Sequence, residues 1–115
     1  MPDTFNRAEL LERVDHDMDF LAETVEMLVT DGRSLLADAR AAAVAGDAPA
    51  LGRAAHALKG MISNFCAAPA QDAALAVEKI GKSGDLAPSG AAIDTLHANL
   101  ESLISDLQSF VRGGA

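Results

Sequence analysis

A short cluster around His56 holds the residues best suited to chemistry. An imidazole is largely neutral near pH 7 and can act as a nucleophile through one of its ring nitrogens. Lys59 follows three residues later, so on a helix it would lie on the same side and could supply a positive charge to a phosphoryl group on that nitrogen. The sequence has no Gly-rich phosphate loop and no nucleotide-binding motif. The cluster therefore provides a nucleophile and a counter-charge, and we do not expect the chain to phosphorylate itself from ATP.

Helical periodicity places this histidine away from the core. On a wheel of about 100° per residue with Leu58 at zero, His56 falls at about 160° and Gly60 at about −160°. The opposite side carries the apolar residues of the segment, which are Leu51, Ala54, Ala55, Met61, Ile62 and Phe65. Gly52 and Gly60 remove side-chain bulk on both sides of the imidazole, at a helix cost of about 1 kcal/mol each. This geometry predicts space for a large partner, and it is also compatible with an ordinary exposed histidine.

The elements that must hold this cluster are all helical. Apolar residues recur at helical spacing between breaks rich in Gly, Pro and Asp, and no segment alternates as a strand does. Asp47 is suited to cap the helix of the cluster, Pro69 is expected to end it, and Asp31-Gly32 is expected to kink or split the long helix before it. The predicted helices are 5–13, 17–45, 48–66, 69–83 and 89–111. We expect an all-α fold in a single domain, residues 1–115: an antiparallel up-down four-helix bundle over about 17–111, with a short additional N-terminal helix across one end.

Composition and charge narrow the function classes. Apolar residues make up 50% of the 115-residue chain and aromatic residues 3%, a mixture typical of helices. The single Cys66 excludes an internal disulfide, and with no secretory pattern in the first residues it favours the cytoplasm. A net charge of −8 argues against nucleic acid and anionic membranes as partners, and no apolar run reaches the roughly 18 residues of a membrane span. Residues 33–84 nevertheless carry +2, against −7 for residues 1–32, which is compatible with a solvated face or with a functional patch.

Several other residues are assigned to packing. The methionines at 18, 27 and 61 fit core or near-core positions, and Cys66 fits a small buried hydrophobe. Asp94 and His97, an acid and a histidine three residues apart, are similar to one half of a carboxylate-bridged metal bundle, but the second half is missing. We therefore expect no metal site in this chain.

The sequence around the cluster resembles a known family. The pentapeptide from His56 to Gly60 and the following LAVEKIGKSGDL resemble the histidine phosphotransfer (HPt) domains of bacterial and eukaryotic multistep phosphorelays. The DxxFLxE-like segment from Asp17 to Glu23 and the AGD break at 45–47 add to this resemblance, which covers nearly the whole chain. Met61 and Ile62 depart from the family, in which small residues are common after the glycine, so we expect altered packing there.

The resemblance implies a role for each residue of the cluster. In the family, the histidine that matches His56 accepts a phosphoryl group on Nε2 from an aspartyl phosphate of a receiver domain and passes it to another receiver. By the same resemblance, Lys59 helps to bind the phosphoryl group, Gly60 leaves room for the partner, and Glu78 orients the ring through Nδ1. Mg²⁺ would belong to the receiver, so we expect no cofactor in this chain. The expected docking surface consists of Gly52, Arg53, Lys59, Gly60, Ser63 and Asn64, with Lys79 and Lys82 from the next helix.

The leading prediction is a monomeric phosphocarrier without autokinase activity, with response-regulator receiver domains as partners and a hybrid histidine kinase as a further candidate. Two other functions compete with it. The alternative is a non-phosphorylated adaptor that docks receivers on the same bundle. A third, a metal-binding carboxylate bundle, needs two Glu-x-x-His motifs and finds none. The sequence is compatible with a free-standing protein and with a domain of a hybrid kinase.

Overall fold

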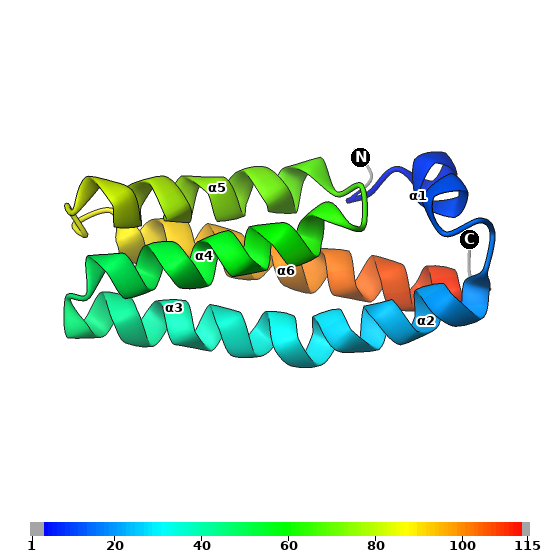
Figure 1. Cartoon of the computed structure of the whole chain (residues 1–115), viewed down its shortest axis with the longest axis horizontal. Coiled ribbons are helices and arrows are strands. Elements are labelled where there is room, and N and C mark those ends of the chain that lie inside the picture. The colour runs from blue at the N-terminus through cyan, green and yellow to red at the C-terminus, as the bar shows by residue number, and fades with distance from the viewer. Residues whose placement is uncertain (1–3, 114–115) are drawn as a thin grey trace.

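The computed structural model describes residues 4–113, and within that range it contains helices and turns but no strand. Figure 1 shows one long helical segment, α2 to α3, lying beside α4, α5 and α6 in an antiparallel bundle, with α1 packed at one end. This confirms the predicted all-α fold and its additional N-terminal helix. The elements are α1 (Arg7–Arg13), α2 (Met18–Met27), the π-helix η1 (Leu28–Gly32), α3 (Arg33–Ala45), α4 (Ala48–Ser63), α5 (Ala68–Ser83) and α6 (Ser89–Val111).

The long first segment of the bundle is continuous but not uniform. It begins at the N-cap Asp17, whose side chain accepts a hydrogen bond from the backbone N–H of Phe20 at 3.0 Å, and it ends at Gly46 in the left-handed region. The interruption expected at Asp31-Gly32 takes the form of a single π-helical stretch, Leu28–Gly32. Gly32 is buried there against the side chains of Leu28 and Leu58, so this irregular turn still packs on the core.

The helix that carries His56 begins as predicted but ends earlier. Asp47 caps α4 by accepting from the backbone N–H of Ala50 at 3.1 Å. The predicted end near residue 66, enforced by Pro69, is wrong, because α4 ends at Ser63 and Pro69 lies in the first turn of α5. A proline is tolerated in a first turn, where its missing N–H is not needed. The chain reverses before it, at Cys66, which has a left-handed backbone with φ of 54° and is half-buried rather than fully buried.

Aliphatic side chains from every bundle helix fill the core. The largest fully buried ones are Leu10, Leu21, Leu28, Leu51, Leu58, Ile62, Ile93, Leu96, Leu100, Leu103, Ile104 and Leu107. Met27 is 57% exposed, so its predicted core or near-core position is wrong. The reason is that Leu21, Val25 and Leu28 form the inward stripe of this segment, and Met27 lies outside it.

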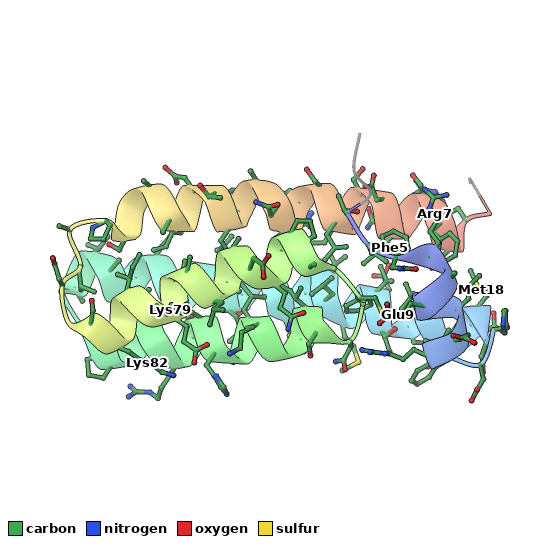
Figure 2. The ribbon with its side chains drawn as sticks, turned by 90° about the horizontal axis from the view of Figure 1, so that it is seen from above. Phe5, Arg7, Glu9, Met18, Lys79 and Lys82 are labelled. Atoms are coloured by element: carbon green, nitrogen blue, oxygen red, sulfur yellow. The ribbon has the colours of Figure 1, made fainter. Side chains whose placement is uncertain are left out.

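The N-terminal segment closes one end of the bundle. Phe5 is buried and packs edge-to-face on Phe110 of α6, with ring centroids 5.4 Å apart, and Arg7 lies over both rings. Figure 2 shows Phe5 and Arg7 together at this end. Arg13 of α1 donates a hydrogen bond to the carbonyl oxygen of Ser63 at the end of α4, at 2.7 Å. Within residues 4–113 no helix combines the length and the apolar character that crossing a membrane requires.

Candidate functional site

His56 lies in the middle of α4 on its outward side. The inward side of the same helix is buried, with Leu51, Ala54, Ala55, Leu58 and Ile62 in the core. The imidazole is 69% exposed, yet its Nδ1 lies 2.8 Å from Oε2 of Glu78 on α5. Nε2 is on the other side of the ring from this contact. The histidine is therefore anchored at one nitrogen and accessible on the rest of its ring.

The carboxylate of Glu78 contacts three basic side chains from two helices. The Glu78 side chain is 2% exposed. Besides His56, Lys59 Nζ lies 2.7 Å from Oε1 and Lys82 Nζ lies 3.1 Å from Oε2. The Lys59 ammonium, assisted by Lys82 and His56, lowers the pKa of Glu78 to about 2, against the opposing effect of burial. Glu78 is thus ionised near pH 7.

The ionised carboxylate determines which ring nitrogen carries the proton. A carboxylate accepts hydrogen bonds and has none to donate, so Nδ1 of His56 must be the donor in the 2.8 Å contact. In a neutral ring protonated at Nδ1, the free lone pair is on Nε2. The geometry consequently presents a nucleophilic nitrogen on the exposed side of α4.

A groove between α4 and α5 runs beside the imidazole. Its volume is about 620 Å³, and it is lined by Ala48, Pro49, Gly52, Arg53, His56, Glu78, Gly81 and Lys82. Gly52 and Gly81 both line it, and the two backbones approach so closely that a Cβ atom added to Gly81 would lie 2.5 Å from the backbone N of Gly52. Gly52 is therefore a helix-packing residue as well as part of the groove. The sequence predicts only a docking role for Gly52; the signal for its packing role is a glycine in the interior of each of two neighbouring helices, Gly52 and Gly81.

Only some of the other predicted docking residues line this groove. Arg53 and Lys82 line it with His56, whereas Lys79, although exposed on the same helix as Lys82, does not. Gly60 is exposed, and a Cβ atom added there would meet nothing within 4 Å. Ser63 and Asn64 lie beyond it, at the C-terminal end of α4. The Ser63 hydroxyl donates a hydrogen bond to the carbonyl oxygen of Gly60. The docking roles of all these residues remain predictions.

Asp94 and His97, the acid and histidine that are similar to half of a metal site, both contact Arg40. Arg40 forms an ion pair with Asp94 at 2.9 Å and lies 3.2 Å from Nδ1 of His97. In the described part of the chain, no three side chains from His, Cys, Asp and Glu gather in a way that could hold a metal ion.

The fold and the site together define a helical bundle that exposes one oriented histidine on its surface. A family model described as "Hpt domain" matches residues 23–109, which is well over half of the chain. The chain belongs to the Hpt family, whose members act in phosphotransfer within phosphorelays. No curated protein and no solved structure matched the chain.

Proposed function

We propose that this chain relays a phosphoryl group between the aspartates of receiver domains through His56. The observation that carries the proposal is the 2.8 Å contact between Nδ1 of the exposed His56 and the buried carboxylate of Glu78. This contact fixes the tautomer and holds the ring, so that Nε2 faces an incoming phosphoryl group without a large loss of side-chain freedom at the moment of reaction.

The chemistry proposed is an in-line exchange. Nε2 of His56 attacks the phosphorus of an aspartyl phosphate, the N–P bond forms, and the P–O bond breaks with its electron pair leaving on the aspartate. The Nδ1 proton stays between the ring and Glu78, and the reverse reaction loads the next receiver. In such a loose transition state, positioning and charge stabilisation provide most of the catalysis. Lys59, which pairs with Glu78 and lies three residues after His56 on the same helix, would neutralise charge on the transferred group.

The partner would supply what this chain lacks. We expect the receiver to bring the Mg²⁺ ion and the aspartate, and the groove beside His56 to accept part of its surface. The sequence contains no nucleotide-binding motif, which supports a phosphocarrier without autokinase activity. The −8 net charge favours a protein partner over nucleic acid or an anionic membrane, and the single cysteine favours a cytoplasmic setting.

Transfer from a radiolabelled, Mg²⁺-loaded receiver tests the proposal. We expect an acid-labile, alkali-stable label on the protein that disappears in His56→Ala. Glu78→Ala should slow transfer about 10- to 100-fold, since hydrogen bonds to charged groups contribute about 1.5–3 kcal/mol. His97→Ala is the matched control, because His97 is an exposed histidine on α6 outside the site.

Three results would contradict it. A label that persists in His56→Ala would place the acceptor elsewhere, and an acid-stable product would exclude phosphohistidine. Receivers that bind the protein without labelling it would instead support the adaptor function.

A further inference from the structure

Glu78 has two lysine partners at a site that contains one anion. Lys59 reaches its Oε1 from α4 at 2.7 Å, and Lys82 reaches its Oε2 from α5 at 3.1 Å. Among the described residues, no other lysine or arginine lies within ion-pair distance of Glu78. Either lysine alone would compensate the charge of the carboxylate, so the second is in excess in the unphosphorylated protein.

Phosphorylation changes this balance. A phosphoryl group on Nε2 of His56 adds about two negative charges next to Glu78. Lys59 lies one turn from His56 on the same helix, and it is the lysine placed to turn toward the new group. If it does so, it leaves Oε1 of a carboxylate whose side chain is 2% exposed, and a buried charge left without a partner is strongly unfavourable.

We propose that Lys82 is a positioning residue that keeps Glu78 paired while Lys59 turns to the phosphoryl group on His56. This inference rests on the proposed function. Lys82 shares Oε2 with Nδ1 of His56, so it holds the carboxylate at the oxygen that orients the ring. It acts through Glu78 and does not itself contact the phosphoryl group. Its side chain is 72% exposed on α5, so its removal leaves the core intact (Figure 2).

The equilibrium of phosphoryl exchange with a receiver separates this role from docking. The ratio of phosphorylated protein to phosphorylated receiver at equilibrium depends on the free partners, so a contact made only in the complex changes the rate and leaves the ratio unchanged. The experiment mixes a radiolabelled, Mg²⁺-loaded receiver domain with wild type, Lys82→Ala, Lys82→Arg, Glu78→Gln and the double variant Lys82→Ala/Glu78→Gln. Arg112→Ala is the control for the loss of one positive charge far from the site, and circular dichroism checks that each variant is folded.

We expect Lys82→Ala to shift the ratio about two- to fivefold toward the receiver, the range set by a partly exposed ion pair, and Lys82→Arg to restore it. In the Glu78→Gln background Lys59 is already released, so Lys82→Ala should have no further effect. An equal shift in both backgrounds would overturn the inference, because it would mean a direct contact with the phosphoryl group. A changed rate with an unchanged ratio would also overturn it, in favour of docking. If the wild-type protein takes up no label at His56, the proposed function itself fails, which is a different result from an unaffected Lys82→Ala.

Discussion

Replacement of Gly81 by alanine tests how the two helices of the site are packed. A Cβ atom at position 81 would lie 2.5 Å from the backbone N of Gly52, 2.6 Å from its Cα and 3.0 Å from the carbonyl oxygen of Ala48. Carbon atoms pack at about 3.5–4.0 Å, so α4 and α5 must separate by about 1 Å. Overpacking costs about 1–3 kcal/mol, and we take the upper part of this range because the neighbour is backbone, which cannot rotate away. Alanine returns about 0.5–1 kcal/mol of helix propensity, which leaves a net loss of about 2 kcal/mol in the free energy of unfolding.

Urea unfolding followed by circular dichroism measures this loss, with Gly52→Ala as the matched control. A Cβ atom at position 52 would meet Gly81 at 3.8 Å, an ordinary contact, so the control should be as stable as wild type or slightly more stable. The reasoning is refuted if Gly81→Ala unfolds at the same urea concentration as wild type, or if both variants lose stability equally.

Three further predictions follow from the site and its helix. Gly60→Ala should raise the free energy of unfolding by about 0.5–1 kcal/mol, because its Cβ meets open space in the free protein. The same Cβ should slow transfer from a receiver that docks on this surface, and a stabilised variant with unchanged transfer would argue against docking at this position. The pKa of Glu78 falls from 4.5 to about 2, chiefly through Lys59, so the folded state binds fewer protons than the unfolded state. The ionised carboxylate should therefore contribute at most about 3 kcal/mol to the free energy of unfolding, reduced by solvent screening. This contribution should be present above about pH 5 and lost as the pH falls toward 2. The free energy of unfolding, measured by urea titration at each pH, should depend less on pH in Glu78→Gln than in wild type. Asp47→Ala removes the cap of α4 and should lower the free energy of unfolding by about 1 kcal/mol in the same assay. An unchanged free energy of unfolding would mean that another group caps the helix.

Helix boundaries were predictable where one local signal dominates. The last helix has the predicted bounds, 89–111, and the Asp47 cap is where the sequence places it. The end of α4 was not predictable, because a proline can mark the end of one helix or the first turn of the next. Pro69 does the latter, and the reversal occurs at Cys66, a residue type that rarely takes a left-handed backbone.

Single-helix geometry predicted the position of His56, whereas Glu78 as its partner from the next helix was pointed to only by the family resemblance. The wheel places His56 on the outer side of its helix, and the structure has it 69% exposed. The spacing of four between Glu78 and Lys82 also permits their contact in any helix. Which atoms meet across α4 and α5 depends on the distance between the two helices, and this distance is set by Gly52 and Gly81 together. Periodicity within one helix contains no information about the backbone of its neighbour.

A phosphoryl acceptor must be both exposed to its partner and fixed in orientation, and these demands conflict for a side chain on a helix surface. In His56, the proposed acceptor, the ring is exposed on α4 and its orientation comes from a buried carboxylate on α5. Glu78 reaches the ring because the helices approach closely one turn before His56 and three residues after Glu78, at the two glycines. Helices usually pack with axes about 8–10 Å apart, and a wider spacing would lengthen the 2.8 Å contact. Gly81→Ala should therefore slow phosphoryl transfer although it removes no side chain from the site, because separating the helices loosens the ring from its anchor.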